Sequence, residues 1–370
     1  MLPPKGQFAV TPSHDQATAG PSPTVVTTPE GFTASWLGSA LRAGGIACQV
    51  HRVVSVESIG TGQMASCYRI TVDATGDVPS SLVAKVSAPG ATHLAANGYR
   101  NELRFYRDLA RHTRGRIARC YYAAMEGDGT HFVLLLEDLA PAVQGDQIAG
   151  CTAGEVRAAL VNLADLHGSL WEHPALDAFD ETSTGADTTE TFVGFMQWGT
   201  EQFIARYADR LATDDVDVLR GFSDRVRGYR TNRVSPRSIV HGDYRLDNLL
   251  YRRAGGADEC IVVDWQTAAV GAPGNDLAFC ISTGLHPADR RAAERDLVAT
   301  YGRRLRTCGV DRADQVLWAD YRHGLGHGVI ITVLGAVTAV RTARGDDMFM
   351  AMASRVCTAI RDLDTLALYE

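Results

Sequence analysis

A short polar segment, residues 241–250, holds the side chains whose types and spacing best suit chemistry. It reads His-Gly-Asp-Tyr-Arg-Leu-Asp-Asn-Leu-Leu, so that Asp243 precedes Asn248 by five positions, and Asp264 follows at the end of an apolar run. In phosphoryl transfer one carboxylate takes the proton of the attacking hydroxyl, while an amide oxygen and a second carboxylate hold Mg²⁺ against nucleotide phosphates. The spacing therefore predicts a phosphoryl-transfer site.

The residues between Asn248 and Asp264 are predicted to fold as a hairpin. Residues 249–251 and 260–263 are short apolar runs typical of strands, and residues 253–258 between them have the composition of a turn. A hairpin of these two runs would bring Asn248 and Asp264 side by side, so that one cation can touch both.

A glycine-rich turn far upstream is typical of phosphate binding. Residues 54–59 are predicted as a strand, Gly60-Thr-Gly62-Gln-Met-Ala65 follows, and residues 66–72 alternate as in a second strand. The motif also fits a dinucleotide-binding turn, but that version must open a helix after its glycines. Because a strand follows here, we predict a hairpin whose backbone lies over phosphates. A β-turn without a ligand is the alternative for any single loop of this kind.

A lysine and a glutamate downstream suit the same nucleotide. Lys85 interrupts the apolar strand predicted at residues 82–86, and Glu102 lies in residues 99–109, whose apolar positions have helical spacing. Kinases place such a lysine on the α- and β-phosphates and orient it with a helix-borne glutamate. The alternatives are a lysine at a sheet edge and a surface ion pair between Glu102 and its neighbouring arginines.

A second predicted hairpin, residues 121–125 and 131–136, ends at Glu137-Asp-Leu139. In a kinase this is where the chain crosses between lobes and where backbone groups bind adenine. Glu137 and Leu139 are therefore candidate nucleotide-binding residues, with an ordinary strand exit as the alternative.

Taken in order, these motifs resemble the aminoglycoside phosphotransferase and choline-kinase-like superfamily of small-molecule kinases. The most specific is His-x-Asp-x₄-Asn over residues 241–248, and the resemblance runs from about residue 33 to the last predicted helix. Gln266, where aminoglycoside kinases more often carry Glu, is closer to the ecdysteroid-kinase-like branch. The opening Thr-Ala-Ser-Trp-Leu of residues 33–37 is closer to that branch as well.

The resemblance implies an α+β, bilobal protein-kinase-like fold. Residues 31–139 would form a small β-rich N-lobe, and residues 140–370 a larger helical C-lobe with the catalytic loop, the metal site and the substrate-binding helices. Residues 1–30 are rich in Pro, Thr, Ala and Ser with little periodicity, and we expect them to be a flexible tail.

The same resemblance assigns roles to individual residues. Asp243 would be the catalytic base, Asn248 and Asp264 the Mg²⁺ ligands, and Lys85 the ATP-phosphate ligand with Glu102 as its partner.

Other residues near the loop are less specific. Arg245 lies where other kinases place a cation that meets the transferred phosphoryl group, and a donor that braces the loop is an equal alternative. Asp276 would help to brace the loop. Protein kinases carry Arg at the position of Gly242 and Asp-Phe-Gly at residues 264–266, so the sequence does not indicate a protein substrate.

Composition and charge exclude several other classes. The 370 residues carry a net charge of −7 with dispersed arginines, which argues against a nucleic-acid partner. The longest apolar run, residues 329–340, is too short to span a bilayer and is predicted to be a buried helix. No secretory signal is evident, so we expect no membrane insertion and a cytoplasmic protein. Eight cysteines without a Cys-x-x-Cys pair suggest neither a disulfide framework nor a zinc site.

Residues 171–230 give opposing indications of the phosphate acceptor. They hold twelve Asp and Glu against six Arg, and an acidic wall would suit a polycation such as an aminoglycoside, although such runs are usually solvated helix faces. The same stretch carries large apolar residues that form core or line a pocket for a bulky alcohol: Phe192, Phe195, Met196, Trp198, Phe203 and Tyr207.

These observations predict an ATP- and Mg²⁺-dependent kinase for a hydroxyl group of a small organic molecule, preferably a largely apolar alcohol. An aminoglycoside or macrolide kinase is one alternative. An inactive kinase-like binding module is another, but such proteins usually lose the lysine, the base or a metal ligand, and all of these are present.

Overall fold

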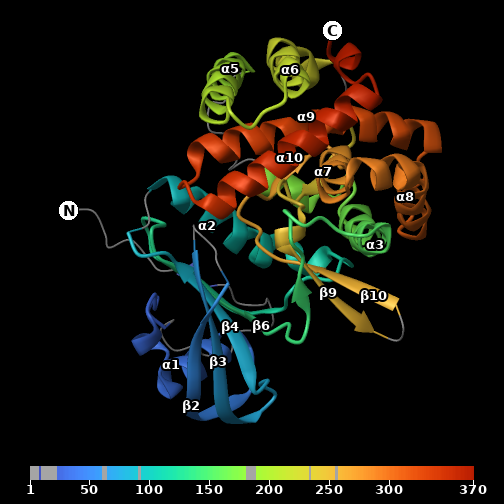
Figure 1. The fold of residues 1–370 in the computed structure, drawn as a ribbon. Coiled ribbons are helices and arrows are strands. Elements are labelled where there is room, and N and C mark those ends of the chain that lie inside the picture. The colour runs from blue at the N-terminus through green and yellow to red at the C-terminus, as the bar shows by residue number, and fades with distance from the viewer. Residues whose placement is uncertain are drawn as a thin grey trace. The chain divides into compact units, whose positions relative to one another are not determined.

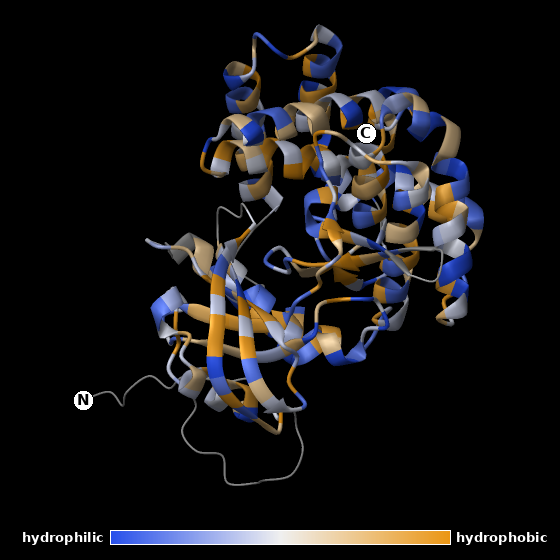
Figure 2. Ribbon diagram, turned by 60° about the horizontal axis from the view of Figure 1, so that its bottom comes forward, coloured by the Kyte–Doolittle hydropathy of each residue, from blue (hydrophilic) through white to orange (hydrophobic). Residues whose placement is uncertain are grey.

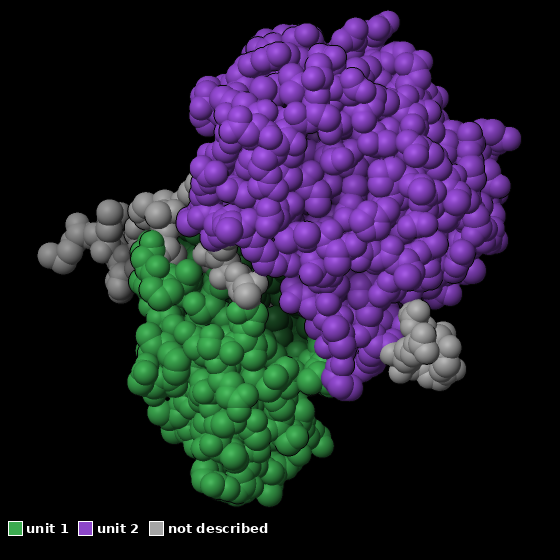
Figure 3. Space-filling model, viewed as in Figure 1, with its two compact units in different colours: residues 1–111, 117–140, 264–267 green, residues 112–116, 141–263, 268–370 purple. Residues whose placement is uncertain are grey.

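The computed structural model of this chain describes residues 8–9, 23–60, 65–90, 93–180, 189–232, 235–254 and 257–370. It divides into two compact units (Figure 3). Unit 1 comprises residues 1–111, 117–140 and 264–267, and unit 2 comprises residues 112–116, 141–263 and 268–370. Unit 1 is rich in strands and unit 2 is mainly helical, as the predicted α+β fold requires (Figure 1).

Unit 1 is built on an antiparallel sheet with the strand order β1-β5-β6-β4-β3-β2. The strands are β1 (Phe8–Ala9), β2 (Cys48–Ile59), β3 (Ala65–Gly76), β4 (Ser81–Ser87), β5 (Cys120–Met125) and β6 (Phe132–Glu137). The strands predicted at residues 54–59, 66–72, 82–86, 121–125 and 131–136 are all confirmed, most of them with longer bounds. Lys85 pairs with Leu134 of β6 in the interior of this sheet.

Apolar side chains of one helix cover this sheet. Helix α1 (Ala34–Ala43) begins where the Thr33 hydroxyl accepts a hydrogen bond from the Trp36 backbone. Trp36 and Leu37 pack with Ile70 and Leu82 of the strands, and the same strands are largely hydrophobic in Figure 2. Part of the expected tail contacts this core, since the Thr24 carbonyl accepts a hydrogen bond from Trp36 Nε1 at 2.8 Å.

The segment that carries Glu102 is only partly an α-helix. Helix α2 spans His93–Arg104, and the chain continues as a π-helical turn over Phe105–Leu109. The helix predicted at residues 99–109 is therefore confirmed, and Tyr106 and Leu109 of its π-helical second half are buried as the predicted spacing requires. π-Turns of this kind are often found at functional sites, because they reposition the side chains that follow.

Helices form most of unit 2, and Figure 1 shows them as the green to red ribbons. They are α3 (Ala153–Ser169), α4 (Ala175–Asp180), α5 (Thr189–Arg206), α6 (Thr213–Thr231), α7 (Gly274–Gly284), α8 (Pro287–Thr307), α9 (Asp314–Thr338) and α10 (Ala343–Asp362). Helix α9 packs against α7, α10 and α5. The predicted buried helix at residues 329–340 is part of α9, but it ends at Thr338, and Val340 beyond it is 74% exposed.

Two small sheets flank the polar segment of residues 241–248 in unit 2. Strand β8 (Ser238–Val240) pairs with β11 (Ala269–Gly271), and β9 (Leu249–Ala254) lies between β7 (Val143–Gln144) and β10 (Ala257–Val262). The predicted β9–β10 hairpin is confirmed, with Leu249 opposite Val262. The segment between β8 and β9 is therefore anchored by a strand at each end. Within the described part of the chain, no helix is long and apolar enough to cross a membrane.

Candidate functional site

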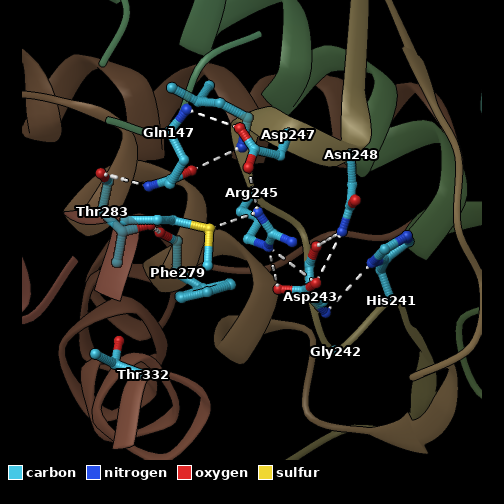
Figure 4. A network of polar contacts seen from close by, with 12 residues as sticks. Gln147, His241, Gly242, Asp243, Arg245, Asp247, Asn248, Phe279, Thr283 and Thr332 are labelled. Carbon is cyan, nitrogen blue, oxygen red and sulfur yellow. Dashed lines mark hydrogen bonds and ion pairs between the residues drawn. The ribbon is translucent and has the colours of Figure 1, made fainter. Parts of the chain in front are cut away.

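The loop between β8 and β9 brings Asp243 and Asn248 into direct contact in unit 2 (Figure 4). Gly242 has a φ of +79°, and the loop ends in a 3₁₀ turn over Leu246–Asn248. Asn248 Nδ2 donates to the backbone oxygen of Asp243 and to its Oδ2, both at 2.9 Å. Because these bonds use the amide nitrogen, Asn248 Oδ1 is the atom that suits a cation.

Arg245 holds the Asp243 carboxylate from the other side. Its Nε lies 2.9 and 3.0 Å from the two Asp243 oxygens, and its Nη1 donates to Asp247 Oδ2 at 2.8 Å. The Asp243 side chain remains 21% exposed. Of the two interpretations of Arg245, the observed contacts are those of a donor that braces the loop.

A buried carboxylate on α7 supports the loop backbone. Asp276 accepts hydrogen bonds from the backbone of His241 at 2.6 Å and of Gly242 at 2.9 Å. His167 Nε2 contacts the same carboxylate at 3.3 Å. Burial alone would raise the pKa of Asp276, but the His167 contact and nearby histidine charges outweigh it, and the pKa is lowered. These are the contacts expected of a loop-bracing residue.

His327 is a contributor to this support that the sequence did not reveal. Its Nε2 lies 2.8 Å from the carbonyl oxygen of Gly242, so this nitrogen donates. Burial lowers the pKa of His327, which favours the neutral ring. Its neighbour His323 stacks on Tyr229 with ring centroids 5.0 Å apart. The one-turn spacing was visible in the sequence, but nothing local showed which helix reaches the loop.

Unit 1 brings Lys85, Glu102 and Asp264 together. Lys85 Nζ lies 2.7 Å from Glu102 Oε2 and 2.9 Å from Asp264 Oδ1. The Lys85 and Glu102 side chains are 8% and 1% exposed, whereas that of Asp264 is 41% exposed. The predicted pair of Lys85 and Glu102 is therefore present, and Asp264 joins the pair in a cluster of three charged residues.

The charges of this cluster do not balance. Burial opposes the charge of Lys85, but the Asp264 and Glu102 carboxylates outweigh it and raise the pKa of the ammonium group. Burial and the Asp264 charge also raise the pKa of Glu102, and Lys85 opposes this effect. With both carboxylates ionised, the cluster has one positive and two negative charges, and the excess lies at the exposed member.

The backbone around Asp264 is fixed in an unusual conformation. Asp264 has a φ of +70°, a region that costs a residue with a side chain about 1–3 kcal/mol. The Trp265 ring stacks on that of Phe105 in the π-turn, with centroids 3.5 Å apart. The backbone N–H of Trp265 donates to Glu102 Oε1 at 3.3 Å. These contacts hold the segment so that the Asp264 side chain meets Lys85.

The remaining predicted nucleotide-binding residues also lie in unit 1. Gly60 ends β2 with a φ of +75°, as a tight turn requires, whereas Gly62 lies outside the described residues. The Glu137 N–H donates to the Arg119 carbonyl at 2.8 Å, so it is engaged within the lobe. Leu139, two residues beyond β6, is 6% exposed.

The predicted site residues thus form two sets. Unit 2 contains Asp243, Arg245 and Asn248, and unit 1 contains Lys85, Glu102 and Asp264. The loop also contains a residue that sequence reasoning passed over. Asp247 is an acidic residue inside the motif itself, and its side chain is only 10% exposed.

Comparison with solved structures shows the kinase-like fold. The GDP complex of wild-type aminoglycoside 2'-phosphotransferase-IIIa is 17% identical, with a TM-score of 0.53, and the match covers 84% of this chain and 94% of that one. Plasmodium vivax ethanolamine kinase is 12% identical, with a TM-score of 0.51, and the match covers 84% of this chain and 83% of that one. The amicoumacin kinase hAmiN, in complex with AMP-PNP, Ca²⁺ and Ami, is 15% identical, with a TM-score of 0.52, and the match covers 83% of this chain and 88% of that one. Identities this low support the bilobal fold alone.

Comparison with protein families reaches further than the fold. Curated protein sequences give no significant match. A model of the ecdysteroid kinase-like family, however, matches residues 60–310, which is more than half of the chain and includes both sets of site residues. Family and fold together are those of a small-molecule kinase-like phosphotransferase, and this chain belongs to the ecdysteroid kinase-like family.

Proposed function

We propose that this protein transfers the γ-phosphoryl group of ATP to a hydroxyl group of a small organic molecule, with Mg²⁺ as cofactor. The observation that carries the proposal is the cluster of Lys85, Glu102 and Asp264. One carboxylate is enough to neutralise a buried ammonium group, so a structural ion pair would need only Glu102. The second carboxylate, that of Asp264, lies 2.9 Å from Lys85 and is 41% exposed, so it is accessible to a cation.

The donor groups suit the expected metal. Mg²⁺ prefers carboxylate and other oxygen ligands and usually shares them with substrate phosphates. Asp264 and the Oδ1 atom of Asn248 are the groups that would hold it. When bound, the ion neutralises phosphate charge during transfer.

The side chains of the chain itself then divide the remaining tasks. Lys85, kept protonated by its two carboxylates, binds the α- and β-phosphates, with Glu102 fixing its position. The turn at Gly60 and Gly62 covers the phosphates, and the backbone at Glu137 and Leu139 binds the base. A full set of these groups favours an active enzyme over an inactive binding module.

Asp243 is the group that acts on the acceptor. Its carboxylate is exposed enough to meet a hydroxyl, and the donors Asn248 and Arg245 fix its orientation. A carboxylate oxygen of Asp243 orients the acceptor hydroxyl and takes its proton as the oxygen attacks phosphorus.

Apolar side chains beside the loop favour an apolar acceptor. Arg245 Nη1 contacts the sulfur of Met348 at 3.1 Å. Met348 belongs to a buried cluster with Phe279 and Met352, and half-buried apolar residues pack on it. Apolar packing of unit 2 therefore reaches the arginine that binds the base, and the half-buried members of this packing, Ile148, Ile331 and Phe349, are the ones that would contact the body of an acceptor.

The large apolar residues in and directly after α5 differ in exposure. Met196, Phe203 and Tyr207 are buried and belong to the core. Phe192 is half-buried beneath the Arg230 guanidinium, which lies 4.5 Å from the ring centroid. Phe195 and Trp198 are 41% and 49% exposed, and their rings stack with centroids 5.5 Å apart, so this pair is the best placed to contact an apolar ligand.

Part of the acidity in the same stretch is paired with arginine. Among the described residues, five of its twelve carboxylates form ion pairs within unit 2: Asp177 and Asp180 with Arg237, Glu190 with Arg227, Glu201 with Arg220, and Asp215 with Arg361. Paired carboxylates attract a polycation weakly, which supports a neutral or singly charged acceptor.

A panel screen tests the proposed activity. Consumption of ATP, and in parallel of GTP, is measured with sterols, amino alcohols, macrolides and aminoglycosides in the presence of Mg²⁺. We expect consumption with at least one largely apolar alcohol, and the Asp243→Asn variant should lower turnover at least about a hundredfold with ATP affinity nearly intact. No acceptor-dependent consumption across the panel, or an Asp243→Asn enzyme as fast as the parent, would contradict the proposal.

The salt dependence of the Michaelis constant distinguishes an apolar acceptor from a polycationic one. Attraction between a polycation and carboxylates is screened over about 8 Å at physiological ionic strength. The Michaelis constant of an apolar acceptor should therefore barely change with added salt. Efficient phosphorylation of kanamycin-like polyamines, with a Michaelis constant that climbs with salt, would favour the antibiotic-kinase alternative.

A further inference from the structure

Two arginines converge on Asp247, the second acidic residue of the loop. Arg245 Nη1 donates to its Oδ2 at 2.8 Å. Arg344 contributes a bidentate contact, with Nη1 at 2.9 Å from Oδ2 and Nη2 at 3.2 Å from Oδ1. The backbone N–H of Gln147 also donates to Oδ1 at 2.9 Å (Figure 4). A single carboxylate therefore joins three parts of unit 2.

Arg344 reaches the loop from a distant part of the sequence. It lies in the first turn of α10, 97 residues from Asp247. The Thr342 hydroxyl caps this turn by accepting from the Gly345 N–H at 3.0 Å. Met348, one turn further along α10, places its sulfur 3.1 Å from Arg245 Nη1. Helix α10 thus contacts both Asp247 and the arginine that Asp247 binds.

These contacts form a chain that ends at the base. Arg344 fixes Asp247, Asp247 binds one edge of the Arg245 guanidinium, and the Nε edge of Arg245 binds both oxygens of Asp243. A planar guanidinium held at two edges has little freedom to rotate. The orientation of the Asp243 carboxylate therefore depends on where Asp247 is held.

We propose that Arg344 is a positioning residue for Asp243 and acts through Asp247 and Arg245. This inference rests on the proposed function, in which Asp243 is the base. It makes the start of α10 part of the catalytic apparatus, although Arg344 touches neither Asp243 nor Asn248.

The pair of Arg344 and Asp247 differs from an ordinary surface ion pair. Exposed pairs contribute little because water competes for both partners. Arg344 is 48% exposed and also lies 3.6 Å from Asp146, but Asp247 is only 10% exposed, and its contact with Arg344 is bidentate, which fixes geometry as well as charge. Gln147, the third partner, is itself fixed, since its side chain bonds the Leu246 N–H and the Thr283 carbonyl.

Substitution of Arg344 with a matched control provides the test. Arg344→Met removes the contact and keeps the stem of the side chain, whereas Arg344→Lys keeps the charge but not the bidentate fork. Arg341→Met is the control, because Arg341 lies on the same segment, is 63% exposed and pairs with Asp346 at 2.8 Å rather than with the loop.

The expected result is a split between turnover and affinity. Arg344→Met should lower kcat roughly tenfold or more with the KM for ATP within about twofold, since misplacing a base affects chemistry rather than nucleotide binding. Arg344→Lys should recover part of the loss, and Arg341→Met should keep the parent's kcat. An Arg344→Met enzyme with the parent's kcat, or an equal loss in Arg341→Met, would overturn the inference.

A crystal structure of the Arg344→Met variant decides the inference independently of any acceptor. We expect Arg245 to leave at least one of its contacts with Asp243. Retention of both contacts at the parent's distances would overturn the inference. If no acceptor is phosphorylated by the parent enzyme, the proposed function fails, but this structural result still shows whether Arg344 holds the loop.

Discussion

The two sets of polar residues differ in how their charges are paired. In unit 1, the single ammonium group of Lys85 lies between two carboxylates, those of Glu102 and Asp264. In unit 2, the guanidinium of Arg245 binds both Asp243 and Asp247, and that of Arg344 binds Asp247 and lies 3.6 Å from the exposed Asp146. The first set keeps an exposed carboxylate beside a shared cation, whereas the contacts of the second fix the position of one carboxylate.

The two sets also differ in where their members come from. Asp243, Arg245 and Asn248 lie within one short loop, and distant residues only support them. Lys85 is 17 positions from Glu102 and 179 from Asp264, so no part of that cluster exists until the lobe folds. A charge imbalance assembled from such distant positions at a positive φ is a costly arrangement, and a ligand is its simplest explanation.

The largest effect is expected from a comparison of the two proposed metal ligands, Asp264 in unit 1 and Asn248 in unit 2. Asp264→Ala removes a charge from the excess in unit 1, whereas Asn248→Ala removes a neutral oxygen. Asp264→Ala should lower turnover by about a hundredfold or more, because a bound metal contributes several kcal/mol of charge stabilisation. Asn248→Ala should lose less and should be partly rescued by high Mg²⁺ or Mn²⁺.

Initial rates over a titration of each metal measure this difference. If both variants bind MgATP as the parent does and neither responds to metal concentration, the two residues do not hold a cation.

Substitutions of Lys85 and Glu102 in unit 1 should have an effect of intermediate size on the use of ATP. Because Lys85 and Glu102 act as a unit, the losses of Lys85→Ala and of the double variant with Glu102→Ala should be similar, roughly ten- to a hundredfold in kcat/KM for ATP. Glu102→Ala alone should cost less, since Lys85 keeps its 2.9 Å contact with Asp264.

A double-mutant cycle checks this coupling, with Glu57→Ala on an exposed position of β2 as the control. Strictly additive losses would show that Glu102 acts independently of Lys85.

The smallest effect concerns the support beneath the loop in unit 2. The pKa of Asp276 is lowered in the folded chain, so the ionised form stabilises the fold above the ordinary carboxyl value of about 3.9. This contribution is lost as the pH falls through the lowered folded pKa. Asp276→Asn should cost about 2 kcal/mol at neutral pH, because it weakens hydrogen bonds to a charged acceptor.

Urea unfolding of parent and variant between neutral pH and about pH 3 measures the difference. The difference in unfolding free energy between the parent and the Asp276→Asn variant should become smaller as the pH is lowered. A difference that stays constant would show that the charge of Asp276 does not cause the loss of stability.

Much of the molecule follows from short-range patterns in the sequence. Short apolar runs identified the strands that hold Lys85 and end at Glu137, because a strand covered on both faces is apolar at nearly every position. Asp243 and Asn248 were expected to act together, and their contact arises from one glycine turn and one 3₁₀ turn between them. Such contacts depend on neighbouring residues and are therefore readable without a fold.

Tertiary packing decided most of the support for these groups. The family resemblance implied that Asp276 braces the loop, but nothing near His327 or Arg344 in the sequence shows that α9 and α10 reach it, because many helices have faces that suit such packing. Packing also turned the chain after Arg104 into a π-turn and divided the aromatic residues of α5 between core and surface. Helix periodicity alone gives each of these aromatic residues a place on the helix, but its exposure depends on which neighbour covers that face.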